Sequence, residues 1–262
     1  MGGPGFERCR RGAGPGPTRR PAVIELGLLA MHDVRTRVGT AREGFTLDIP
    51  RFDLALGDRV AIIGPSGSGK SLFLELLGLI RAPESAQEFQ FRKRSGETLD
   101  IARLWARRDP ARLIHARRRD IGFLLQTGGL LRSLSILENV LLPAQLAGTP
   151  TSYGAEMIER LGLSGQRRRR PATLSVGQRQ RAALARAMST RPTLLLADEP
   201  TAALDSRNAD GALQVIVDAV EQQLVSAAVI ATHDRERALR LGFREVALTS
   251  SAEGSIFASC AA

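Results

Sequence analysis

The stretch GPSGSGKS at residues 64–71 contains residue types that bind phosphate groups. It fits the pattern Gly-x-x-x-x-Gly-Lys-[Ser/Thr], with an apolar run before it and a helix-forming segment after it. Glycines at this spacing let backbone N–H groups turn inward around phosphates, while Lys70 can reach the β and γ phosphates and Ser71 can ligate Mg²⁺. This context favours a phosphate loop over a glycine-rich loop with an incidental lysine. The predicted binding residues are Gly64, Pro65, Ser66, Gly67, Ser68, Gly69, Lys70 and Ser71.

Two adjacent carboxylates follow another apolar run, in LLLADEP at residues 194–200. Asp198 suits the coordination of Mg²⁺, and Glu199 would then face the attacking water as a general base. Alone, the pair could belong to an exposed loop. Beside a phosphate loop it predicts metal-assisted hydrolysis of a nucleotide.

Gln126 and His233 stand at the ends of two further apolar runs, IGFLLQ and SAAVIATHD. A glutamine amide can hold a water and contact Mg²⁺ without adding charge, although a plain loop residue is the simpler interpretation of Gln126 alone. His233 has two ring nitrogens with which to reach a γ-phosphate. The alternative is that His233 merely precedes Asp234, which we expect to cap the helix that follows.

The apolar runs that end in these residues predict the sheet that positions them. Continuous apolar runs are typical of buried parallel strands, and helical patterns lie between these four. Open α/β sheets bind ligands beyond the carboxyl ends of their strands. We therefore expect the polar residues at the four strand ends to meet in one site. The four runs are RVAIIG, IGFLLQ, TLLLADE and SAAVIATHD.

The segments around these runs predict further elements. Residues 44–64 are typical of strands, and residues 88–101 of a hairpin that turns near Ser95-Gly96. A mostly helical stretch at roughly 130–190 indicates a lobe inserted into the main domain. Within it, SILE at 135–138 is a capping box that opens one helix, and Gly162 is expected to end another.

The segment ATLSVGQRQRAALARAM, residues 172–188, predicts a long helix with Ser175 as its N-cap. A capped helix with no further role is one interpretation. A helix start also offers unpaired N–H groups and the positive end of the helix dipole, which together suit an anion.

Composition limits the class of protein. With 262 residues, 43% of them hydrophobic, the chain is expected to form one large α/β domain over residues 23–250, between a disordered basic tail (1–22) and a C-terminal tail (251–262). No apolar run is long enough to span a bilayer, so we expect the chain to be soluble. Cys9 and Cys260, at opposite ends, suggest a reducing compartment rather than a disulfide framework.

The net charge of +10 comes almost entirely from arginine. Nucleic acid or an anionic membrane surface could account for such a charge. The basic clusters are scattered and aromatic residues make up 4% of the chain, so few could stack on bases. Solvated faces of an arginine-rich protein are the favoured interpretation, and a nucleic-acid partner is unlikely on this ground.

The order of the motifs resembles the nucleotide-binding subunit of ATP-binding cassette (ABC) transporters. The resemblance covers most of residues 23–250, and LLRSLSILENVLLPAQLAG (130–148) is most similar to the lipoprotein-release and macrolide-export branch. The motifs that carry it are GPSGSGKS, FLLQ, LSVGQRQR, LLLADEPTAALD and ATHD.

The resemblance implies an α/β fold, with a P-loop NTPase core built on a parallel sheet, an N-terminal antiparallel β part and an inserted helical lobe. It implies ATP and Mg²⁺ as ligands and two copies that dimerise head to tail. Ser175, Gly177 and Gln178 would close the site of the other copy, and Asp205 would contribute to cofactor binding. It also implies a separate membrane permease, docked by the loop after Gln126, and a cytoplasmic location on the inner face of the membrane.

Two other functions remain open at this point. One is a soluble ABC ATPase that acts on nucleic acid or ribosomes. The 49 residues from Gln126 to Ser175 are too few for the coiled coil of chromosome-repair types, and the two cassettes of translation-factor types are not present. The other is a weakly hydrolysing regulatory subunit, which Val176 would support. This valine stands where the family prefers glycine, and we expect strain if its φ is positive.

The nucleotide base is expected to be held weakly. The family usually stacks adenine on an aromatic residue upstream of the phosphate loop, but residues 34–44 contain none, and Arg37 or Val38 stands in that place. Stacking on an aromatic ring contributes about 1–3 kcal/mol per base. We therefore expect the affinities for ATP and GTP, measured by competition binding, to differ by less than about tenfold. A hundredfold preference for ATP would show that another residue stacks the base.

Overall fold

The structure is a computed structural model that describes residues 27–39, 44–126, 128–202, 204, 206–250 and 255–260, with only the backbone at 207, 250 and 255–260. The predicted tail at 1–22, Cys9 and Asp205 lie outside these residues. Within these described ranges, ten strands form one hydrogen-bonded sheet in the order β5-β4-β1-β2-β10-β9-β3-β8-β7-β6. The strands are β1 (Leu29–Gly39), β2 (Gly44–Leu54), β3 (Arg59–Ile63), β4 (Glu88–Arg92), β5 (Thr98–Asp100), β6 (Ile121–Leu124), β7 (Leu194–Asp198), β8 (Ala227–Thr232), β9 (Arg244–Ser250) and β10 (Ser255–Cys260).

The four predicted apolar runs are the strands β3, β8, β7 and β6, and they pair in parallel. Side chains along β7 alternate between two hydrophobic cores. Leu194 and Leu196 pack in one core, whereas Leu195 and Ala197 pack in the other. Both faces of this strand are therefore buried, which explains why its sequence shows an unbroken apolar run.

The antiparallel part consists of β1, β2, β4 and β5. The hairpin of β4 and β5 turns at Gly96, whose φ is 86°, as the sequence predicts. Residues 255–260, which the sequence assigned to a C-terminal tail, form β10. This strand pairs in parallel with β2 and antiparallel with β9, so it joins the antiparallel part to the parallel core.

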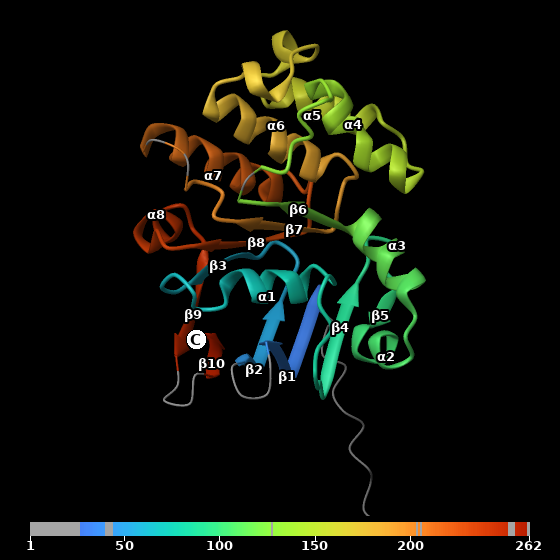
Figure 1. Cartoon of the computed structure of the whole chain (residues 1–262), viewed down its shortest axis with the longest axis vertical. Helices are drawn as coiled ribbons and strands as arrows, with labels where there is room; N and C mark the ends of the chain where they lie inside the picture. Colours follow the sequence, from blue (N-terminus) through green and yellow to red (C-terminus); the bar gives the residue numbers. More distant parts are fainter. Residues whose placement is uncertain are drawn as a thin grey trace, which may run out of the picture.

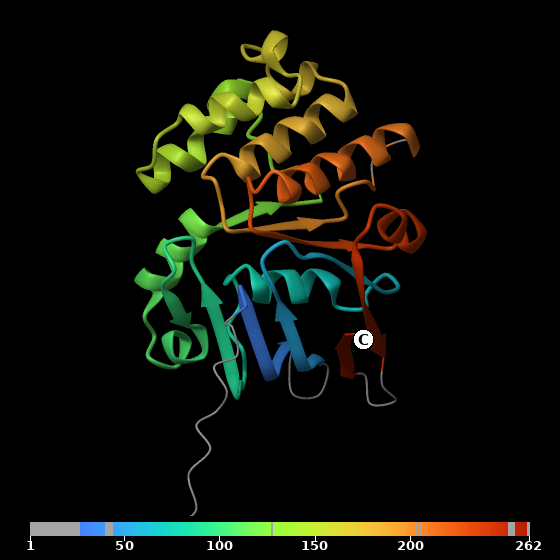
Figure 2. The same ribbon diagram turned by 180° about the vertical axis from the view of Figure 1, so that it is seen from behind.

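The helices cover the sheet and form the inserted lobe. Figure 1 shows α4, α5 and α6 gathered at one end of the molecule, at the end opposite β1 and β2, and Figure 2 shows the same arrangement from behind. No helix among the residues just given is long and apolar enough to cross a membrane. The helices are α1 (Lys70–Leu77), α2 (Ile101–Ala106), α3 (Pro110–Asp120), α4 (Ile136–Ala147), α5 (Ser152–Arg160), α6 (Val176–Met188), α7 (Ser206–Glu221) and α8 (Arg235–Arg240).

The predicted helix ends are confirmed. Ser135 and Glu138 form the reciprocal bonds of a capping box at the start of α4. After α5, Gly162 has φ 66°, a left-handed conformation that suits glycine just past a helix. Asp234 caps α8, because its side chain accepts a hydrogen bond from the backbone N–H of Arg237.

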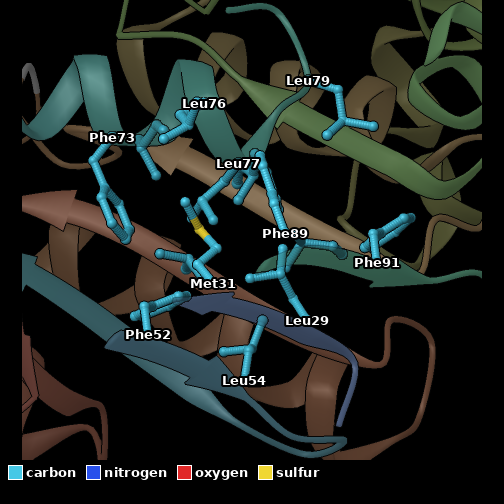
Figure 3. Packing of buried hydrophobic residues seen from close by; sticks show 14 of the residues in the cluster. Leu29, Met31, Phe52, Leu54, Phe73, Leu76, Leu77, Leu79, Phe89 and Phe91 are labelled. Carbon is cyan, nitrogen blue, oxygen red and sulfur yellow. The ribbon is translucent and has the colours of Figure 1, made fainter. Parts of the chain in front are cut away.

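Helix α1, which begins inside the phosphate loop, is anchored by its aromatic residue. Phe73 is fully buried and meets Phe52 of β2 edge to face, with ring centroids 5.1 Å apart. Figure 3 shows Phe73, Leu76 and Leu77 of the helix facing Met31 and its neighbours on the sheet. Burial of this face fixes where the helix begins, and hence where the phosphate loop lies.

Replacement of Phe73 by alanine is expected to lower the free energy of unfolding by about 3–5 kcal/mol, because a fully buried ring leaves a cavity. Chemical denaturation followed by circular dichroism measures the change. Ile80 lies shortly after the same helix and is 47% exposed, so Ile80→Ala should cost less than about 0.5 kcal/mol. Equal losses in the two variants would contradict this account of the anchor.

Candidate functional site

The four parallel strands bring their predicted polar residues into one cavity. The cavity has a volume of 540 Å³ and lies beyond the carboxyl ends of β3, β6, β7 and β8. It takes in the phosphate loop and the residues that the sequence placed at the other three strand ends. Its lining is Val38, Phe45, Ser66, Gly67, Ser68, Gly69, Lys70, Ser71, Leu72, Gln126, Asp198, Glu199, Ala202 and His233.

The phosphate loop has a backbone that glycine alone fits. Gly67 and Gly69 have φ values of 77° and 88°, in the left-handed region. A Cβ on Gly69 would also lie 2.8 Å from the Phe45 ring, and one on Gly64 would lie 2.5 Å from the Ser68 hydroxyl. Ser68 Oγ is buried and has no hydrogen-bond partner in the described part of the chain. A tight glycine cradle with an unpaired hydroxyl fits a bound phosphate group.

Lys70 is the buried cation of the site. Its Nζ donates hydrogen bonds to the carbonyls of Gly64 (2.8 Å) and Pro65 (3.1 Å) and lies 3.8 Å from Glu199 Oε1. The loop's own carbonyls thus hold the ammonium over the cradle. A buried positive charge in this position favours the binding of an anion, since little water screens it.

Two of the predicted magnesium ligands, Ser71 and Asp198, are hydrogen-bonded to each other. Ser71 Oγ donates a 2.7 Å hydrogen bond to Asp198 Oδ2, and Gln126 lines the same cavity. No group of three or more His, Cys, Asp or Glu side chains suited to a metal occurs among the described residues. A hydroxyl, an amide and one carboxylate, completed by substrate phosphates, fit Mg²⁺ better than a metal that needs an all-protein cage.

Glu199 is held in an unusual conformation. Its φ of 44° is in the left-handed region, at a cost on the order of 1–3 kcal/mol for a non-glycine residue. Its backbone N–H donates to the carbonyl of Ala231 in β8 at 2.9 Å. This bend turns the Glu199 carboxylate into the cavity. The sequence contains no pattern that predicts the bend.

His233 is hydrogen-bonded to the predicted general base. Its Nδ1 lies 3.0 Å from Glu199 Oε2, while 68% of the His233 side chain is exposed. The expectation that both ring nitrogens are available to a phosphate is therefore wrong. Because Nδ1 faces the carboxylate, Nε2 is the nitrogen left to contact phosphate.

Gln126 lies between the cavity and a neighbouring cleft. The cleft measures 360 Å³ and is lined from β6, α3, α4 and α6, with Leu125, Gly128 and Gly129 on its wall. Arg186 of α6 also lines it and donates a hydrogen bond to the carbonyl of Gly129. Burial lowers the pKa of the Arg186 guanidinium. A single loop, residues 125–129 without the undescribed Thr127, thus contributes to both hollows.

The start of α6 has the geometry of an anion-binding helix end. Ser175 and Gln178 form a capping box, in which the Ser175 N–H donates to Gln178 Oε1 (3.0 Å) and the Gln178 N–H donates to Ser175 Oγ (3.2 Å). The N–H groups of Val176 and Gly177 have no partner within the helix. These residues do not line the cavity of the phosphate loop, and Gly177 lines a separate 440 Å³ hollow between α6 and α7.

The expected strain at Val176 is absent. Val176 is the first residue of α6, and it is not among the described residues with a positive φ. The residue is 41% exposed at the start of the helix. A valine in this position alters the surface of the helix start and leaves the backbone unstrained.

Phe45 is a site residue that the sequence reasoning missed. It lies one residue beyond the segment in which an aromatic residue was sought, at the start of β2. Its ring packs against Gly69 and lines the cavity with Val38. The alternation of the strand could have revealed it, because Phe45 and Leu47 both point toward the side on which α1 packs.

Comparison with protein families and curated proteins gives consistent matches. The family model for ABC transporters matches residues 47–202. The lipoprotein-releasing system ATP-binding protein LolD of Maricaulis maris is 40% identical over 84% of this chain and 91% of its own length. The LolD protein of Nitrobacter hamburgensis is 36% identical over 84% of this chain and 92% of its own length.

Solved structures agree with these matches. The chain is similar to the dimeric bacterial ABC transporter cassette MJ0796, with a TM-score of 0.72 and 29% identity over 87% of this chain and 96% of the cassette. A dimer of MJ0796 in a post-hydrolysis state bound to ADP and Pi matches with a TM-score of 0.70 and 30% identity over the same shares.

Proposed function

The chain belongs to the ABC transporter family, and on this premise we propose which of its residues hydrolyse ATP and which face meets the membrane partner. It is an ATP-binding and ATP-hydrolysing subunit that dimerises and serves a membrane permease formed by another protein. We favour this function over that of an ATPase acting on nucleic acid or ribosomes, because the similar proteins are named as transporter ATP-binding proteins and cassettes. We also favour it over the function of a regulatory subunit that hydrolyses ATP weakly, because a similar cassette is described in a post-hydrolysis state bound to ADP and Pi.

The hydrogen bond between Glu199 and His233 is the observation that supports the assignment of catalytic roles. Glu199 takes a proton from the water whose oxygen attacks the γ-phosphorus, and the bond to the β-phosphate oxygen breaks to release ADP and phosphate. His233 holds the Glu199 carboxylate through Nδ1 and presents Nε2 to the γ-phosphate. Lys70 and the loop around it hold the phosphates.

Three residues are suited to hold Mg²⁺ beside the phosphates. Ser71 and Asp198 supply a hydroxyl and a carboxylate, and Gln126 supplies an amide that can also hold the attacking water. When bound, Mg²⁺ acts as a Lewis acid that neutralises charge on the phosphate oxygens. Asp205 is proposed to contribute to nucleotide binding by resemblance to the family.

The cleft beside Gln126 is proposed as the docking site of the permease. It is lined largely by apolar side chains, among them Leu125, Leu142 and Leu146, of which Leu125 and Leu146 are well exposed. An apolar hollow next to a catalytic loop suits a helix of a partner protein. The chain would then work in the cytoplasm, held at the inner face of the membrane by its partner.

The similarity to two LolD proteins supports a finer proposal. Both are named as ATP-binding proteins of lipoprotein-releasing systems, and both match over more than 90% of their own length. We infer that the permease of this chain belongs to a system of the same class. Reconstitution with such a permease should stimulate ATP hydrolysis in the presence of a lipoprotein, whereas stimulation by an unrelated cargo alone would overturn the inference.

Replacement of Glu199 by glutamine is expected to retain ATP binding while lowering turnover by about a hundredfold or more, the usual scale for loss of a general base. The variant should also accumulate a nucleotide-bound dimer, measured by size-exclusion chromatography with ATP and Mg²⁺. Glu236→Gln makes the same chemical change at an exposed position on α8 and should leave turnover unchanged. Near-normal hydrolysis by Glu199→Gln would remove Glu199 from this role.

We propose further that the start of α6 acts on the nucleotide held by the other copy. The proposal is supported by the separation of Ser175 from the cavity of its own phosphate loop. Take one protomer with Lys70→Ala and another with Ser175→Arg. Each homodimer should have two damaged sites. In the mixed dimer, both lesions fall in one site and the second site stays intact.

The measurement is the amount of occluded nucleotide per mixed dimer, because turnover could require both sites. Two different affinity tags isolate the mixed dimers and establish that they form. We expect occlusion of about one nucleotide per dimer, well above either homodimer. If isolated mixed dimers occlude no more than the homodimers, Ser175 does not act in trans.

A further inference from the structure

Helix α8 begins two residues after His233 and contains three arginines that differ in exposure and in their contacts. Arg235 pairs with Glu245 of β9, and Arg240 pairs with Asp210 of α7. Both of these side chains are well exposed, at 58% and 61%. Exposed pairs of this kind contribute little to stability, because water screens the two charges. The third arginine, Arg237, is different.

Arg237 is 17% exposed and contacts three side chains of the described residues. Its Nε donates to Asp210 Oδ1 at 2.8 Å, and one terminal nitrogen donates to Ser206 Oγ at 3.1 Å. The other terminal nitrogen donates to Asp234 Oδ2. Each of the three guanidinium nitrogens thus donates to a different side chain, an arrangement that a lysine ammonium could not reproduce.

These partners lie on two segments that follow two catalytic strand ends. Asp234 is the residue directly after His233, at the end of β8. Ser206 and Asp210 stand in the first turns of α7, which follows Glu199 after a short loop. Arg237 therefore joins the segment behind His233 to the segment behind Glu199.

The contacts close a ring around the catalytic pair. On one side, His233 Nδ1 meets Glu199 Oε2 at 3.0 Å. On the other side, Arg237 bonds both segments through charged groups, and its hydrogen bond holds the pKa of Asp210 below the ordinary value. Asp234 is also fixed by its cap bond from the Arg237 N–H at 3.1 Å. Movement of either segment must break a charge-assisted hydrogen bond at a partly buried site.

We propose that Arg237 is a positioning residue for ATP hydrolysis, which holds His233 in hydrogen-bond contact with Glu199 by tying α8 to α7. The proposal rests on the proposed roles of Glu199 and His233. Arg237 is not one of the residues that line the cavity of the phosphate loop. Its loss therefore slows hydrolysis and leaves nucleotide binding intact.

The test compares Arg237→Met with Arg240→Met. Both changes remove one bond to the same Asp210 carboxylate, and Arg240 bonds neither Asp234 nor Ser206 in the described contacts. Arg237→Met should lower kcat by about tenfold to a hundredfold, the effect of a displacement of about 1 Å at a reacting group. KM and the Kd for ATP should stay within twofold of the wild-type values. Arg240→Met should stay within twofold in all three quantities.

A second measurement separates positioning from general stability. In a His233→Ala background, the residual turnover of radiolabelled ATP should fall no further when Arg237→Met is added, because the contact that Arg237 supports is already lost. Thermal melting of all variants reports the folded fraction. If Arg237→Met does not fold, Arg237→Lys replaces it and is expected to show the same kcat loss, since it keeps the charge but not the fork.

The outcomes distinguish a failure of the positioning role of Arg237 from a failure of the catalytic role proposed for His233. If His233→Ala hydrolyses ATP normally, the role proposed for His233 is wrong and the inference falls with it. If His233→Ala is impaired but Arg237→Met equals Arg240→Met, the inference alone is overturned. The inference would also be overturned if adding Arg237→Met to His233→Ala lowered the residual turnover as much as it does in the wild-type protein, because Arg237 would then act by a route other than His233.

Discussion

The in-register pairing of β7 with β8 is the constraint on which the site depends. Asp198 lies opposite Ala231, and the Ala231 carbonyl accepts the N–H of Glu199 just beyond the strand. This bond holds the left-handed bend at Glu199 and sets its carboxylate opposite His233, two residues past Ala231. A slip of one residue would turn the side chains of the shifted strand to the wrong cores and would separate Glu199 from His233.

At the amino ends of the parallel strands, the described residues form contacts that stabilise the fold, away from the proposed catalytic residues at the carboxyl ends. Asp120 accepts hydrogen bonds from the Thr193 hydroxyl and from the Arg94 N–H, at the ends where β6 and β7 begin. The Arg94 guanidinium, whose pKa is lowered by burial, reaches from the β4–β5 turn to the carbonyls of Pro192 and Leu224. The hairpin is thereby fastened to the parallel core, so stability and chemistry occupy different ends of the sheet.

The sequence predicted what depends on local pattern and missed what depends on distant contacts. Buried strands and capped helices are recognisable because apolar runs and capping residues act over a few positions. Strand β1 was not predicted: its inward alternation changes phase at Asp33, which has φ 47°, so Met31 and Val34 both face the core. The bend at Glu199 arises from a tertiary contact that no neighbouring residue signals. The alternation of β2 does place Phe45 on the buried side, but its packing on Gly69 depends on the tertiary fold.

Helix α6 extends from the proposed trans nucleotide contact at Ser175 to the loop beside the proposed permease cleft. It runs for 13 residues, about 20 Å at the usual helical rise, from Ser175 at its N-cap past Arg186 near its end. Ser175 is the residue that we propose acts on a nucleotide of another copy, whereas Arg186 donates a hydrogen bond to the Gly129 carbonyl beside the cleft that we propose for the permease. On these two proposals, a displacement of the N-terminus of α6 in the dimer would be transmitted along the helix to the loop that contains Gln126. The same loop lines both the cavity of the phosphate loop and the cleft proposed for the permease, so the two proposed sites are adjacent along one short segment.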